Sequence, residues 1–173
     1  MRDSQRQRLY DAENEFRKLI SYESFKDIEE TRKFIEKVWN SKFTRKHFPI
    51  VTRHPCPYVA DGRGTTWARG GLRRINLPAG WARNKIVALH ELSHSVTIHN
   101  NIPIHGREFA AAMLLLLNHF IGKKESKLLK QVFRKRGVKF RPKKKIIISF
   151  ERLEQLRERG RLLAAKRKEN ANL

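Results

Sequence analysis

Two histidines and a glutamate interrupt an otherwise apolar stretch of the chain, in the order His90-Glu91-Leu92-Ser93-His94. The flanking aliphatic residues predict a largely buried helix over residues 85–98, which Asn84 can cap. Residues four apart project from the same side of a helix, so both imidazoles can bind a single metal ion. Two buried imidazoles and a carboxylate need partners, and a metal ion would supply one. The pattern therefore predicts a metal site, with Zn²⁺ as the cofactor.

The third protein ligand of such a site has three candidates. His99 follows the motif closely, but positions 97 and 100 lack the glycine and histidine of the pattern HExxHxxGxxH. Glu108 would complete a site of two histidines and one glutamate. His105 comes at the end of the loop before the next predicted helix, from which it can fold back. We expect His105 as the ligand and Glu108 as a carboxylate partner of a bound imidazole, with His99 and Glu108 as the alternative ligands.

Glu91 is the candidate catalytic residue because it directly follows the first histidine of the motif. A carboxylate at this position can reach a water activated by the metal. It would take the proton of that water during attack and pass it to the leaving amine.

Positive charge is concentrated toward the C-terminus. The 173-residue chain has 39 Lys and Arg against 17 Asp and Glu, a formal charge of +22. Residues 1–121 contribute +8 and residues 122–173 contribute +14. Clustered charge of one sign indicates a polyanionic partner, so we expect nucleic acid to bind the Lys/Arg-rich residues 122–173. A solvated surface or an acidic protein partner is the alternative interpretation.

The length of the chain suits one domain with an appendage. We expect an α+β domain over residues 1–138 and a basic extension over residues 139–173. The extension is predicted to contain an amphipathic helix over about residues 150–168, whose leucines pack back on the domain or dock to a partner protein.

Periodicity in the first 138 residues predicts the elements of that domain. Besides the motif helix, we expect helices over residues 9–20, 24–39, 106–122 and 125–136. Residues 48–57, with three prolines, are expected to be extended. The turn signal at 61–64 and the segment 72–77 predict a small antiparallel sheet, in which residues 75–77 hold a substrate backbone or only cover the motif helix. Trp39, Trp67 and Trp81 are expected in the core.

Three features bear on the cellular compartment. Cys56 is the single cysteine, so no internal disulfide can form, as is typical of reducing compartments. The longest apolar run, residues 109–117, is about half the length that crosses a bilayer. The N-terminal residues lack the apolar stretch of a secretory signal. We therefore expect a cytoplasmic protein, nucleoid-associated or phage-encoded, with no membrane partner.

The motif, followed after ten residues by His105-Gly106-Arg107-Glu108-Phe109, resembles the core of the SprT/Spartan-like zinc proteases, which reads HExxH and then HGxxF or HGxxW. The resemblance implies a zincin-like domain in which His90, His94 and His105 bind zinc and Glu91 is the catalytic base.

The chain is also similar, more closely, to a family of metallohydrolases of actinobacteria and their phages. This likeness depends on the Arg-Asp-Ser-Gln-Arg segment at residues 2–6, on Tyr10 and on the Asp-Gly-Arg-Gly turn at 61–64. It covers residues 2–140, and the zinc motif is its most specific part.

The sequence thus predicts a zinc-dependent metallohydrolase, a peptidase of SprT-like type that acts on a protein or peptide. The basic residues would recruit it to nucleic acid or nucleoprotein. One alternative is a nucleic-acid-binding or assembly protein of a phage or mobile element, in which zinc is only structural. Another is a hydrolase of a small amide, which would be indifferent to the basic extension.

Overall fold

The computed structural model describes residues 3–98, 103–141, 155, 157–161 and 163. The chain divides into two units, Met1–Pro142 and Lys143–Leu173. The elements of the first unit, in chain order, are α1 (Arg6–Leu19), α2 (Ile28–Trp39), α3 (Lys42–His47), the 3-10 helix η1 (Pro49–Thr52), β1 (Tyr58–Ala60), β2 (Arg74–Asn76), α4 (Lys85–Thr97), α5 (Arg107–Phe120) and α6 (Lys123–Lys135). The unit is therefore α+β and rich in helix.

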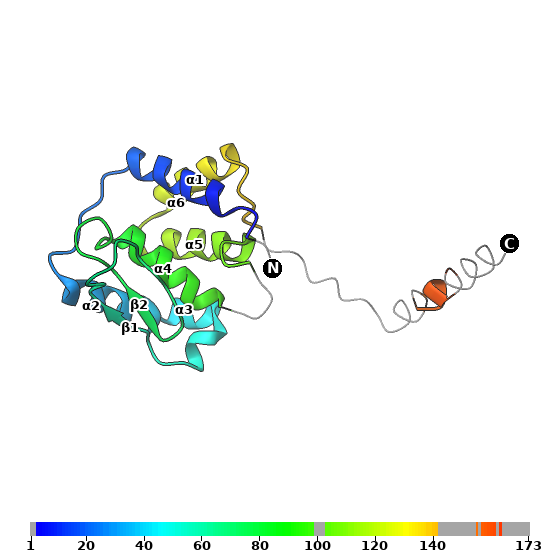
Figure 1. Ribbon diagram of the computed structural model, residues 1–173, viewed down its shortest axis with the longest axis horizontal. Helices are drawn as coiled ribbons and strands as arrows, with labels where there is room; N and C mark the ends of the chain where they lie inside the picture. The colour runs from blue at the N-terminus through cyan, green and yellow to red at the C-terminus, as the bar shows by residue number, and fades with distance from the viewer. Residues whose placement is uncertain (1–2, 99–102, 142–154, 156, 162, 164–173) are drawn as a thin grey trace. The chain divides into compact units, whose positions relative to one another are not determined.

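Helix α4, which contains the histidine motif, is the central element of this unit. The side chain of Asn84 caps it by accepting hydrogen bonds from the backbone N–H groups of Ile86 and Val87, each at 3.0 Å. Every residue of α4 is buried except Lys85, His94 and Thr97. Figure 1 shows α4 between α5 on one side and the layer of α2, α3 and the two strands on the other. The helix predicted over residues 85–98 is confirmed.

Helices α1, α5 and α6 pack together on one side of α4. Apolar residues at helical spacing on α1, such as Leu9 and Phe16, are fully buried against this group. Helix α6 ends at Lys135, and Gly137 follows two residues later with a φ of 67°, in the left-handed region that favours glycine. The helices predicted in these regions are confirmed, with shifts of a few residues at their ends.

The two strands pair in parallel, so the predicted antiparallel sheet is wrong for β1 and β2. Tyr58, Val59 and Ala60 lie opposite Arg74, Ile75 and Asn76, respectively. The turn at 61–64, with positive φ at Gly62 and Gly64, does not return the chain into a neighbouring strand. Residues 61–73 instead cross over, so that β2 runs in the same direction as β1. An antiparallel bridge between Arg69 and Asn76 then covers the other side of β2. Asn76 therefore has a backbone partner on each side and is not at a free edge.

The segment 48–57 also differs from the prediction, because its first part is helical rather than extended. The short helix α3 lies directly before this segment, and Ser41 caps it by accepting a hydrogen bond of 3.0 Å from the N–H of Thr44. Pro49 then begins η1, where its fixed φ fits the first position of a helix and its missing N–H is not needed.

The three tryptophans do not share one environment. Trp39 is buried, as predicted, whereas Trp67 and Trp81 are 65% and 52% exposed. The prediction of a core position is therefore wrong for these two. In the part of the chain that the structure describes, none of the helices combines the length and apolarity needed to cross a membrane.

In the second unit, residues 155, 157–161 and 163 are helical. The rest of the helix predicted over residues 150–168 lies outside the described residues.

Candidate metal centre

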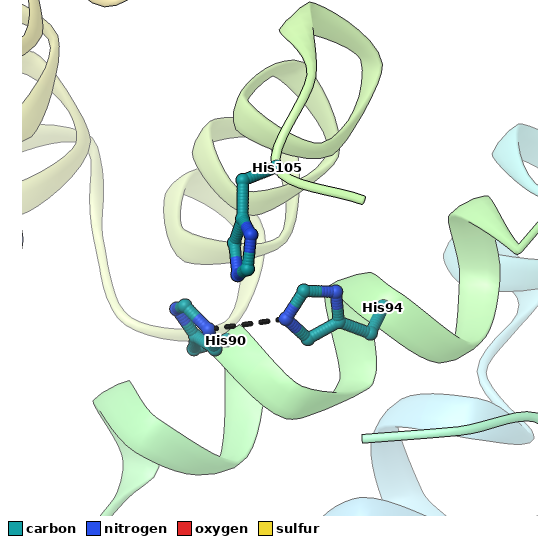
Figure 2. A group of neighbouring side chains, drawn as sticks. All are labelled: His90, His94 and His105. Atoms are coloured by element: carbon teal, nitrogen blue, oxygen red, sulfur yellow. Dashed lines mark hydrogen bonds between the residues drawn. The ribbon is translucent and has the colours of Figure 1, made fainter. Parts of the chain in front are cut away.

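The three histidines predicted to bind a metal lie together in the structure. His90 and His94 come from adjacent turns of α4, and His105 comes from the segment directly before α5. Their candidate ligand nitrogens all lie within 4.8 Å of one another, and the Nε2 atoms of His90 and His94 are 3.2 Å apart. Figure 2 shows the ring of His105 pointing toward the two histidines of α4. Three imidazoles gathered in this way are a donor set that suits Zn²⁺.

Two carboxylates contact the imidazoles of His90 and His105 at Nδ1, the ring nitrogen that does not face the other histidines. Glu13 Oε1 lies 2.9 Å from His90 Nδ1, and Asp3 Oδ2 lies 2.6 Å from His105 Nδ1. Each carboxylate accepts a hydrogen bond from the Nδ1–H group, which leaves the lone pair of Nε2 directed to the centre of the group. This arrangement is the one expected of histidines that bind a metal through Nε2.

Glu108 is not brought to the three histidines. It makes no hydrogen bond to them and instead lines a separate cavity of about 540 Å³ with His47 and His54, among others. Its position near the start of α5 turns its side chain toward that cavity, and Asp3 and Glu13 occupy the role expected of it. His99, the other alternative, lies outside the described residues.

Sequence reasoning missed Asp3 and Glu13, although the sequence holds a signal for each. Glu13 follows Leu9 by four positions and precedes Phe16 by three, so it falls on the buried side of α1. A carboxylate on that side needs a partner. Asp3 lies in the N-terminal segment on which the family resemblance depends, but the resemblance assigned it no role.

Burial sets the protonation of the site. Burial lowers the pKa of His94 to about 2, with further lowering by His90 and His105. Burial also lowers the pKa of His105, against the opposing effect of Asp3. For His90, burial lowers the pKa, but the charge and hydrogen bond of Glu13 outweigh it and leave the pKa raised. At neutral pH, His94 and His105 are therefore neutral, as metal binding requires.

Glu91 is buried beside the histidines, and burial raises its pKa to about 7, against the lowering effect of His90. A hydrogen bond from the backbone of Gly70 also opposes the rise. A carboxyl group with a pKa near 7 can both accept and release a proton at neutral pH, which is the property of a general base that later acts as an acid.

Gly70 brings the segment 67–71 against α4 at the level of Glu91. A Cβ atom on Gly70 would lie 2.1 Å from the backbone carbonyl oxygen of Glu91, so only glycine fits. The hydroxyl of Ser95 fixes the next residue by donating a hydrogen bond of 2.8 Å to the carbonyl of Gly71. Residues 67–71 thereby form one wall of the site next to Glu91.

Two cavities open on the site. One, of about 460 Å³, is lined by Glu91, His94, His105 and the segment 67–71, among others. The other, of about 270 Å³, is lined by His90, Glu91 and Trp81, among others. The three histidines and the buried carboxylate therefore line open cavities.

Comparison of the chain with protein-family models, with curated proteins and with solved structures gives no match. What the protein does is therefore inferred from the site itself.

Proposed function

We propose that the protein is a zinc-dependent hydrolase, a peptidase of SprT-like type. The observation that carries this proposal is the convergence of His90, His94 and His105 beside the buried carboxyl of Glu91, next to open cavities. Zinc bound by the three histidines would acidify a water and polarise the scissile carbonyl.

The residues of the chain would share the remaining work. Glu91 takes a proton from the attacking water and gives it to the nitrogen of the leaving amine. Glu13 and Asp3 hold the rings of His90 and His105 in the orientation that presents Nε2. The wall formed by residues 67–71 keeps Glu91 in place.

The alternative function, nucleic-acid binding with a purely structural zinc, is less well supported. Structural zinc sites are closed by four protein ligands, whereas catalytic sites have three and an open position. Among the described residues the cluster consists of three histidines, and cavities open on it. The open side favours a catalytic role for the metal.

In this proposal, binding to nucleic acid brings the enzyme to its nucleoprotein substrate. Residues 122–173 contribute +14 of the formal charge, so their binding to a polyanion is expected to weaken steeply as salt is added. A filter-binding titration at several salt concentrations, with the full chain and with a chain that ends at residue 138, tests this role. A binding constant that is insensitive to salt would contradict it.

The hydrolytic function is tested by Glu91→Gln, which preserves the shape of the side chain and removes the base. We expect the variant to retain zinc and to lose hydrolysis of casein and of a DNA-bound protein. Glu29→Gln, at an exposed ion pair with Arg32, is the matched control and should behave as the wild type. Hydrolysis that survives in Glu91→Gln would refute the mechanism.

A further inference from the structure

Tyr10 brings a hydroxyl group from α1 to the candidate ligand nitrogen of His105. Its oxygen lies 3.1 Å from Nε2 of His105, the same nitrogen that faces the proposed metal. Its ring stacks on that of His90, with centroids 5.9 Å apart and planes inclined by 19°. Tyr10 also lines both cavities of the site together with Glu91. The hydroxyl therefore belongs to the reaction site rather than to the packing of α1 alone.

The direction of this hydrogen bond follows from the partner on the other side of the ring. Because the Nδ1–H of His105 donates a hydrogen bond to Asp3, Nε2 of the neutral ring is an acceptor. The hydroxyl of Tyr10 is then the donor. A metal that takes the lone pair of Nε2 removes this acceptor. A partly buried O–H group left without a partner is unfavourable, so the hydroxyl would turn to another oxygen in the cleft.

A positive charge also lies near Tyr10, because the guanidinium of Arg6 is over its ring, 5.6 Å from the centroid. Glu91, the proposed base, comes from α4, whereas Tyr10 comes from α1. A base and a hydrogen-bond donor supplied by different elements can act on two different oxygen atoms, that of the water and that of the substrate.

We propose that Tyr10 is a second catalytic residue, whose hydroxyl donates a hydrogen bond to the carbonyl oxygen of the scissile amide as that oxygen gains negative charge. This inference rests on the proposed hydrolytic function. Attack by water forms a C–O bond while the electron pair of the carbonyl moves to its oxygen, and Glu91 takes the proton of the water. The C–N bond then breaks, the carbonyl re-forms, and the amine takes the proton from Glu91. Tyr10 keeps its own proton throughout and stabilises the intermediate charge.

The test compares Tyr10→Phe with the control Tyr22→Phe, a partly exposed tyrosine beyond the end of α1. Three quantities are measured on full-length protein: zinc per chain, kcat and KM on casein, and the affinity of the zinc protein for acetohydroxamate, a small anion that binds zinc. Tyr10→Phe is expected to retain zinc, to lose about 10²–10³-fold in kcat with little change in KM, and to bind acetohydroxamate roughly tenfold more weakly. The control should match the wild type in all three.

Two results would overturn the proposal. One is an unchanged affinity for acetohydroxamate with kcat within a few fold of the wild type. The other is a fall in kcat that is matched by loss of zinc, which would make Tyr10 a residue that positions His105 or binds the metal.

Failure of the role proposed for Tyr10 can be distinguished from failure of the proposed hydrolytic function. If the wild type hydrolyses nothing, the proposed function fails, and the acetohydroxamate affinities still decide whether Tyr10 stabilises an anion. If Glu91→Gln is inactive but Tyr10→Phe is not, the function stands and the role of Tyr10 falls.

Discussion

Replacing Glu13 by glutamine tests the carboxylate that holds His90. The side chains of His90 and Glu13 are only 8% and 7% exposed, and their nitrogen and oxygen lie 2.9 Å apart. Water cannot easily replace a bond buried to this degree. A hydrogen bond to a charged group contributes about 1.5–3 kcal/mol, and loss of such a partner weakens metal binding about 10–100-fold. We therefore expect Glu13→Gln to raise the Kd for zinc by about 10–100-fold, or roughly 1.4–2.7 kcal/mol.

Asp3→Asn is expected to act in the same direction but less strongly. Its carboxylate is 2.6 Å from His105 Nδ1, yet its side chain is 22% exposed, so water can take part of its place. We expect Asp3→Asn to raise the Kd for zinc by about tenfold, the lower end of the range expected for Glu13→Gln.

The assay is a competition titration of metal-free protein against a colorimetric zinc chelator, with circular dichroism to verify the fold. Glu108→Gln is the decisive comparison, because Glu108 was the carboxylate expected from the sequence but lines a different cavity. Its Kd should equal that of the wild type. Wild-type affinity in Glu13→Gln, together with weakened binding in Glu108→Gln, would refute the arrangement described above.

Three further predictions concern stability. Gly70→Ala places a Cβ atom 2.1 Å from the carbonyl oxygen of Glu91 and should destabilise the fold by about 1–3 kcal/mol, measured by urea denaturation. Asn84→Ala removes the cap of α4 and should lower the free energy of unfolding by about 1 kcal/mol, or the Tm by about 4 °C; an unchanged Tm would contradict the capping role. Hydrogen bonds and ion pairs with Lys135 and Arg136 lower the pKa of Glu15, so the stability they contribute is present above the usual glutamate pKa and is lost as pH falls through the lowered value. Glu15→Gln should therefore reduce the acid dependence of Tm.

The sequence predicted those parts of the site that depend on local geometry. His90 and His94 share a side of α4 because they are four residues apart, and Asn84 caps that helix because its side chain precedes the apolar run. The sequence also predicted that His105 folds back toward these two histidines, because it lies in the loop just before α5.

The carboxylate partners could not be predicted in the same way. Asp3 lies 102 residues before His105, and Glu13 lies 77 residues before His90. Periodicity places Glu13 on the buried side of α1, but only the packing of α1 and of the segment before it against the other helices decides which histidine each carboxylate meets. The parallel pairing of β1 and β2 has the same origin, since it depends on the path of residues 61–73 rather than on the strands themselves.

The most direct test of the central claim, that His90, His94 and His105 hold zinc, is the zinc content of purified protein determined by mass spectrometry. The wild type should contain one zinc per chain, and His105→Ala should contain far less after dialysis against a mild chelator. His54→Ala, an exposed histidine outside the cluster, should match the wild type. Equal zinc in His105→Ala and the wild type, or no zinc in either, would contradict the claim.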